Sequence, residues 1–170
     1  MKILEKIEEE VRSWNIPRFV QLTLLLIIVF FLSTGIHESA HLIVAYLIGC
    51  NAGIGEVKLL TGETGVDCPN DWQYGITALA GPLVSFAVGF YLWFSEVKPM
   101  EMGELSEFRM FAVILFFLSA IFQLFPGLIY SDGWHAISFG IPPGIVWGLW
   151  FLIVGLTANI IISEPIRRTS

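Results

Sequence analysis

The chain has 170 residues, of which 55% are hydrophobic and 14% are charged. Because a soluble domain usually carries roughly 25% charged residues, this composition predicts a membrane protein and argues against a soluble one. The formal net charge is −6, and the acids are spread through short polar segments. No basic face is therefore expected that could hold a phosphate backbone, which argues against nucleic acid as a partner.

Residues 1–18 differ from the rest of the chain. They are polar and rich in glutamate up to Trp14, which does not fit a cleaved signal peptide, so we expect the first apolar segment to stay in the mature protein. Apolar residues recur at helical spacing before Pro17 ends the pattern: Ile3, Leu4, Ile7, Val11 and Trp14. We expect residues 1–18 to form an amphipathic helix on the membrane surface and residues 19–170 to form the transmembrane domain.

Long segments without Lys, Arg or Asp occupy residues 19–50, 72–95, 110–131 and 136–163. Each reaches the roughly 20 residues that a helix needs to cross a bilayer, so we predict about four transmembrane helices. The first, with about 32 residues, would reach about 48 Å as one helix and exceed the ~30 Å hydrocarbon layer. It should protrude, tilt or break near Ser33-Thr34-Gly35. The expected fold is an all-α membrane protein.

The polar loop at residues 51–71 has the signature of a small β-hairpin, with a turn signal in the Gly-Glu-Thr-Gly sequence at residues 62–65. Cys50 and Cys68 bracket this loop and could pair if it faces an oxidising compartment. We favour the alternative, in which both are small apolar residues. The acidic stretch at residues 96–109 is expected to be a solvated connection.

The first apolar segment contains His-Glu-Ser-Ala-His at residues 37–41, which fits the His-Glu-x-x-His pattern. On a helix the two imidazoles project from one face, one turn apart, and can share a zinc ion, while Glu38 is left to act as general base. A charged group in an apolar span costs about 2.5–3.5 kcal/mol and needs a partner or a purpose, which a bound dication supplies. The alternative is that these side chains hydrogen-bond to neighbouring helices or to lipid headgroups.

A catalytic zinc site usually takes three protein ligands, so a third ligand is required. Asp132 lies at the edge of an uncharged span and follows Pro126 and Gly127, which should break the third helix. His135 is the rival ligand. Asp132 could instead be an ordinary Asp-Gly turn residue, and His135 could be an interfacial histidine.

Three motifs together resemble those of the site-two protease family of intramembrane zinc metalloproteases. They are His-Glu-x-x-His at residues 37–41, Gly-Pro-x-x-Ser at residues 81–85, and Gln-x-x-Pro at residues 123–126 followed by Asp-Gly at residues 132–133. The resemblance covers about residues 19–135 and implies a core of three transmembrane helices.

The resemblance also implies a role for each motif residue. The zinc ligands would be His37, His41 and Asp132, with one Zn²⁺ per chain, and the catalytic base would be Glu38. Ser85 and Gln123 stand where the family usually has asparagines thought to contact substrate, which makes them the candidate substrate-positioning residues.

The sequence thus predicts an intramembrane zinc metalloprotease, a multi-pass protein of the cell membrane that cleaves peptide bonds in or near transmembrane segments of membrane-protein substrates. One alternative is a catalytically silent relative that binds membrane segments as a chaperone or regulator, and another is a small metal transporter. The intact Glu38 argues against the first, and the shortage of further ligands along the spans argues against the second. Nothing in the sequence indicates an oligomeric state.

Two expectations about orientation conflict. With four crossings both termini share one side, where most Lys and Arg residues also gather, so the positive-inside rule places that side in the cytoplasm and the candidate site toward the outer face. The family resemblance instead implies a site nearer the cytoplasm.

Overall fold

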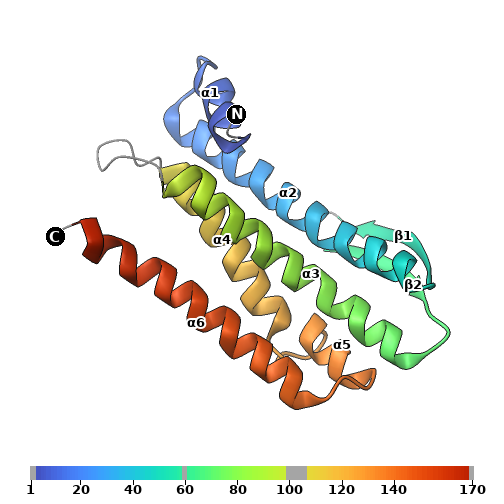
Figure 1. The fold of residues 1–170 in the computed structure, drawn as a ribbon. Coiled ribbons are helices and arrows are strands. Elements are labelled where there is room, and N and C mark those ends of the chain that lie inside the picture. The colour runs from blue at the N-terminus through green and yellow to red at the C-terminus, as the bar shows by residue number, and fades with distance from the viewer. Residues whose placement is uncertain (1–2, 59–60, 99–106, 169–170) are drawn as a thin grey trace.

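The structure is a computed structural model that describes residues 3–58, 61–98 and 107–168. Its elements in chain order are α1 (Ile3–Arg12), α2 (Arg18–Leu47), β1 (Asn51–Lys58), β2 (Thr61–Asp67), α3 (Asp71–Leu92), the π-helical turn η1 (Trp93–Val97), α4 (Glu107–Leu124), α5 (Asp132–Ser138) and α6 (Pro143–Arg168). Figure 1 shows the long helices side by side, with α1 and the C-terminal end of α6 at one end and the hairpin and α5 at the other. The prediction of a helical fold with a small hairpin is confirmed.

Three of the described helices are long and apolar enough to cross a membrane. They are α2, the helix that α3 forms with η1 (Asp71–Val97), and α6 over Pro143–Ile162. α4 contributes a shorter apolar stretch, Phe108–Leu124, which runs back along α3 and also contacts α6 (Figure 1). The described residues therefore match a membrane protein, with three helices of spanning length where the sequence predicted about four.

α2 is one uninterrupted helix of 30 residues, so of the three outcomes expected for this segment the break near Ser33-Thr34-Gly35 does not occur, and protrusion or tilt is left. The helix is about 45 Å long at 1.5 Å per residue. One glycine costs a helix only about 1 kcal/mol relative to alanine, and the apolar residues around Gly35 outweigh that cost. Pro17 immediately precedes the first turn, and Gly49, with φ +85°, ends the helix in the left-handed conformation.

The third and fourth predicted segments have different boundaries in the structure. α4 ends at Leu124, two residues before Pro126, and the following residues form a turn that leads into the short helix α5. α5 is followed by Gly140, with φ +91°, and α6 begins at Pro143, because proline suits the first turn of a helix. The third predicted segment was thus expected to break near Pro126, where α4 ends. The separate seven-residue helix α5 that follows was not predicted.

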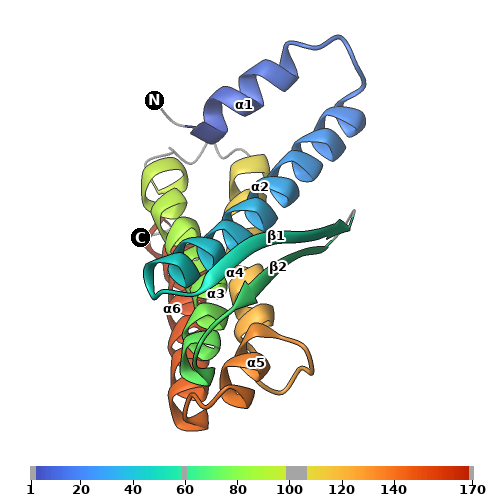
Figure 2. The same ribbon diagram turned by 90° about the vertical axis from the view of Figure 1, so that its right-hand side faces the viewer.

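β1 and β2 pair antiparallel, with Asn51 opposite Asp67 and an irregularity between Ile54 and Val57. Figure 2 shows this hairpin running alongside α2, which both strands contact. The predicted turn at residues 62–65 was wrong, because those residues belong to β2. The two strands are joined through residues 59–60, which lie outside the described part of the chain.

Cys50 and Cys68 form a disulfide, so our preference for unpaired cysteines was wrong. The physical reason is the strand register. Because Asn51 pairs with Asp67, the two flanking cysteines are brought to a Cα–Cα distance of 4.4 Å. The disulfide closes the base of the hairpin and joins the end of α2 to the start of α3.

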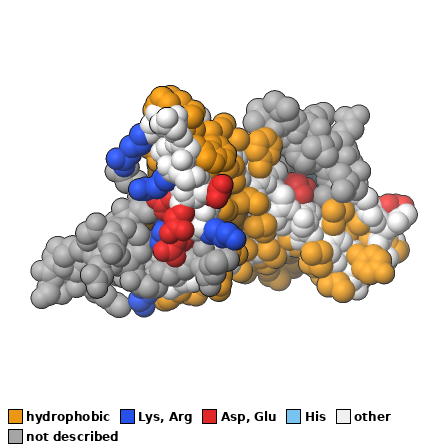
Figure 3. All heavy atoms as spheres, turned by 90° about the horizontal axis from the view of Figure 1, so that it is seen from above, with side chains coloured by type: hydrophobic (Ala, Val, Ile, Leu, Met, Phe, Trp, Pro, Cys, Tyr) orange, Lys and Arg blue, Asp and Glu red, His pale blue; other side chains and the backbone are white. Residues whose placement is uncertain are grey.

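α1 packs across the start of α2 and the end of η1, with Leu4, Glu8 and Val11 buried. Nε of Arg109 on α4 donates to Oε2 of Glu8 at 3.1 Å, and the Leu4 amide donates to Oε1 of Glu96 at 3.3 Å. Figure 3 shows many of the visible charged side chains gathered near α1, while hydrophobic side chains cover much of the remaining described surface.

The acidic stretch at residues 96–109 was expected to be solvated. Residues 99–106 lie outside the described part of the chain, so most of that prediction is not addressed. At its start the prediction was wrong, because the side chain of Glu96 is buried against the first turn of α1. The stretch is therefore anchored to the fold at its N-terminal end.

Candidate metal centre

The two histidines of the motif lie on the buried face of α2. Their spacing of four residues is close to one helical turn, which places His41 one turn beyond His37 on the same side. Both side chains are buried, and the two ring centroids are 4.7 Å apart. The two Nε2 atoms are 3.1 Å apart, so both rings direct the same nitrogen toward one point.

Asp132 reaches the same point from the first turn of α5. Its Oδ2 atom lies 2.9 Å from Nε2 of His37 and 3.7 Å from Nε2 of His41. Ser131 caps α5: its hydroxyl accepts a hydrogen bond from the Trp134 amide at 3.1 Å and donates one to the carbonyl oxygen of Phe125 at 2.8 Å. The turn after the helix break therefore fixes the carboxylate that follows it.

Two glycines allow this close packing. A Cβ atom added to Gly133 would lie 2.1 Å from the carbonyl oxygen of Leu124, so only glycine lets α5 approach the end of α4 this closely. A Cβ atom added to Gly81 on α3 would lie 2.5 Å from Nε2 of His41 and 2.6 Å from Nε2 of His37. Gly81 therefore lets α3 pack against the two imidazole rings more closely than any other residue would.

The three converging atoms fit a tetrahedral zinc ion. Zinc bonds of about 2.0–2.1 Å at tetrahedral angles separate neighbouring ligand atoms by about 3.3–3.4 Å. The distances among Nε2 of His37, Nε2 of His41 and Oδ2 of Asp132 are 2.9, 3.1 and 3.7 Å, which bracket that value. Oδ2 of Asp132 is also buried and has no hydrogen-bond partner among the described residues. Two imidazoles and a carboxylate are a donor set that suits zinc.

The electrostatics of the site favour an ionised Asp132. Burial by itself would raise the pKa of this carboxyl group, but the adjacent His37 and His41 side chains outweigh burial and hold its pKa below the ordinary value. The group is therefore available as an anionic ligand at neutral pH.

The far nitrogens of both rings are held by α3. Nδ1 of His41 lies 2.7 Å from the backbone carbonyl oxygen of Thr77, which can only accept, so this nitrogen carries a proton. In the neutral ring, which is the form that binds a metal ion, Nε2 then keeps its lone pair. Nδ1 of His37 lies 3.2 Å from the hydroxyl oxygen of Ser85. The sequence analysis missed Thr77. Its position four residues before Gly81, on the same face of a helix, was the signal that could have identified it.

The other predicted site residues, Glu38, His135, Gln123 and Ser85, differ in how close they lie to the histidine pair. Glu38 is partly buried, and one ligand atom from each of His37, Glu38 and His41 lies within 4.8 Å of the others. His135 packs among aromatic rings, 5.1 Å from Trp134 by ring centroids, and no described interaction joins it to the histidine pair. Gln123 is exposed near the end of α4, and Ser85 is fully buried against His37.

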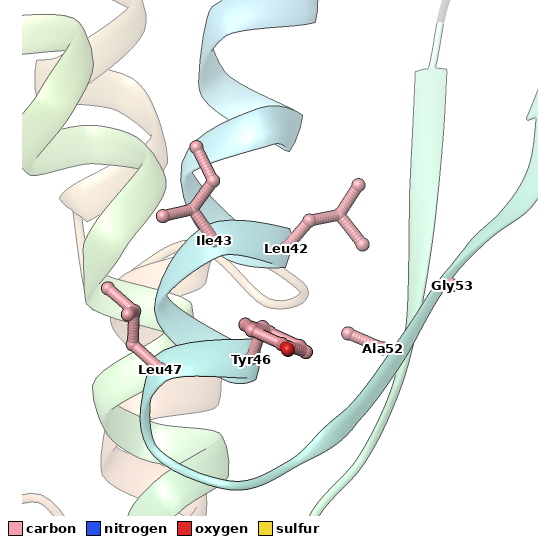
Figure 4. A pocket seen from close by; sticks show the side chains of 6 residues that line it. All are labelled: Leu42, Ile43, Tyr46, Leu47, Ala52 and Gly53. Carbon is pink, nitrogen blue, oxygen red and sulfur yellow. The ribbon is translucent and has the colours of Figure 1, made fainter.

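Two apolar hollows follow α2 near the site. One, with a volume of about 360 Å³, lies between the end of α2 and β1 (Figure 4), and its lining consists of Leu42, Ile43, Tyr46, Leu47, Ala52 and Gly53. The other, of about 460 Å³, lies along α2 beside Val84 of α3. Ile43 lines both hollows, so they adjoin along one side of α2.

Comparisons with protein-family models, with curated proteins and with solved structures find no match to this chain. The motifs of the sequence and the geometry of the site are therefore the basis for inferring a function.

Proposed function

We propose that this protein is an intramembrane zinc metalloprotease that resembles the site-two proteases. The observation that supports this most directly is the convergence of Nε2 of His37, Nε2 of His41 and Oδ2 of Asp132 within 3.7 Å of one another. Glu38, directly after the first of these ligands, supplies the carboxylate that hydrolysis requires. A silent binder or a transporter would not need this base.

Zinc, when bound, supplies a Lewis acid that polarises a peptide carbonyl and makes water more acidic. The chain supplies the remaining functions. His37, His41 and Asp132 hold the ion, and Glu38 takes a proton from the attacking water and passes it to the leaving amine. Gly81 lets α3 lie against both rings without displacing them, because a Cβ atom at this position would meet ring atoms of both histidines.

The proposed substrates are transmembrane segments of other membrane proteins. Three helices of spanning length support placement in a bilayer, and we assign α4 as a fourth crossing of a multi-pass protein in the cell membrane. A transmembrane helix must unwind before its peptide bonds can be cleaved, because its backbone groups are already hydrogen-bonded. The adjoining hollows beside α2, next to the open edge of the hairpin, offer an apolar surface where an extended segment could bind.

The test uses the purified full-length protein with a panel of single-span membrane peptides. We expect cleavage of at least one peptide, its loss with a zinc chelator, and its return when zinc is added. Glu38→Gln should bind zinc normally and cleave nothing, because the amide keeps the shape of the carboxylate and loses the base. The matched control is Glu10→Gln, the same substitution at an exposed position on α1, which should cleave like the wild type.

Two results would each overturn one part of the proposal. Cleavage by Glu38→Gln would reject Glu38 as the base while leaving the protease assignment in place. A wild-type protein that binds zinc but cleaves none of the peptides would favour the catalytically silent reading.

A further inference from the structure

One face of α3 contacts α2 through residues spaced four apart: Gln73, Thr77, Gly81 and Ser85. Nε2 of Gln73 donates to the carbonyl oxygen of Ile48 at 2.6 Å, which fixes α3 against the end of α2. The next three positions along this face all lie against the histidine pair. Helical spacing therefore lines up one side of α3 with the candidate metal ligands.

Ser85 is the polar side chain at the inner end of this face. It is fully buried, and its hydroxyl oxygen lies 3.2 Å from Nδ1 of His37. A serine hydroxyl that accepts the Nδ1 proton leaves Nε2 of the same ring unprotonated and directed toward Asp132 and His41. A hydrogen bond to the ring nitrogen that does not bind the metal sets both the tautomer and the orientation of a metal-binding histidine.

We propose that Ser85 is a positioning residue for the zinc ligand His37 and not a contact for substrate. Its complete burial leaves no surface that a peptide could reach, whereas the family resemblance would assign this position to substrate contact. The inference rests on the metal centre of the proposed function. It does not depend on the reaction that the centre performs.

Thr157 on α6 provides a control away from the metal centre. Its hydroxyl oxygen is buried and has no hydrogen-bond partner among the described residues. No described interaction joins Thr157 to His37 or His41, so removing its hydroxyl leaves the support of both rings in place. Removing the Ser85 hydroxyl takes away the support of His37. The two substitutions each delete one buried hydroxyl and differ in whether that hydroxyl contacts a ligand.

The experiment compares Ser85→Ala with Thr157→Val in the purified full-length protein. Zinc affinity is measured by chelator competition, and the coordination geometry is read from the visible absorption of the Co²⁺-substituted protein. Ser85→Ala should weaken zinc binding by about tenfold to a hundredfold and alter the Co²⁺ spectrum. Thr157→Val should match the wild type in both measurements. Circular dichroism checks that each variant is folded.

The possible outcomes separate this inference from the proposed function. Wild-type zinc affinity together with an unchanged Co²⁺ spectrum in Ser85→Ala would overturn the positioning role. If such a variant also showed a raised KM for a cleaved peptide, Ser85 would be a substrate contact. The expected loss of affinity in a protein that cleaves no peptide would support the positioning role and reject only the protease assignment. A wild-type protein that binds no zinc would reject both.

Discussion

Oδ2 of Asp132 lies 2.9 Å from Nε2 of His37, although a hairpin and two long helices separate these residues along the chain. The contact exists because the turn after α4 returns the chain to α2 and places the carboxylate on the first turn of α5. His135, one helical turn further along α5, packs against aromatic rings. The two rival third ligands are thus distinguished by the direction in which α5 presents them.

The first prediction concerns the two rival third ligands, Asp132 and His135. Asp132→Asn should weaken zinc binding by at least about tenfold, because the amide is a poorer ligand and carries no charge to compensate the ion. His135→Ala is the control and should leave the affinity unchanged. Chelator competition on the two purified variants measures the difference. The opposite order would make His135 the third ligand.

The second prediction concerns the space beside the two Nε2 atoms. Gly81→Ala should lower zinc affinity by about tenfold or more, because the added methyl group would lie 2.5–2.6 Å from ring atoms of both histidines and push them apart. The control is Gly35→Ala on α2, where an added Cβ meets nothing within 4 Å. Elemental analysis after gel filtration reports the metal content of both. Equal zinc content in the two variants would contradict the steric argument.

The third prediction concerns the attachment of α1. Glu8→Gln should lower the stability of the folded protein by about 2 kcal/mol, because it removes the charged acceptor of a largely buried hydrogen bond from Arg109. Glu9→Gln, one residue along and exposed, should have no measurable effect. Thermal unfolding in detergent compares the two. Identical midpoints would mean that the hydrogen bond between Glu8 and Arg109 contributes nothing measurable to the attachment of α1.

The fourth prediction concerns orientation. A disulfide between Cys50 and Cys68 favours an oxidising compartment on the hairpin side, which agrees with the positive-inside rule and places α1 in the cytoplasm. In a background without the native cysteines, Trp72→Cys should react with a membrane-impermeant thiol reagent in intact cells, and Ser13→Cys should be protected. Both positions are exposed. Labelling of Ser13→Cys alone would support the orientation implied by the family resemblance.

The features that depend on local sequence were predictable. The helical spacing of His37 and His41 was enough to place both rings on one face, and Pro126 was enough to end a helix. The structure brings Asp132 to the histidines, as the motif suggested. Asp132 could be proposed as the third metal ligand from the sequence because few acids lie near the apolar spans, which left few candidates.

The features that depend on tertiary contacts were not predictable. The pairing of Cys50 with Cys68 follows from the hairpin register, which the sequence does not specify when a strand is irregular. The burial of Glu96 depends on the approach of α1, an element far away in sequence. The burial of Ser85 could not be read from its motif either, and that burial favours contact with His37 over contact with substrate.

The position of the site along α2 has a consequence for its supply of water. His41 lies six residues before Leu47, the last residue of the helix, which corresponds to about 9 Å of axial distance. Hydrolysis consumes one water molecule for each bond cleaved, and a bilayer interior does not provide it. Water would reach the proposed metal centre across fewer than two helical turns, beside the hairpin. It would not have to travel along the full length of the helices. In the proposed protease, the scissile bond of a bound substrate would lie at about this distance from the hairpin end of α2.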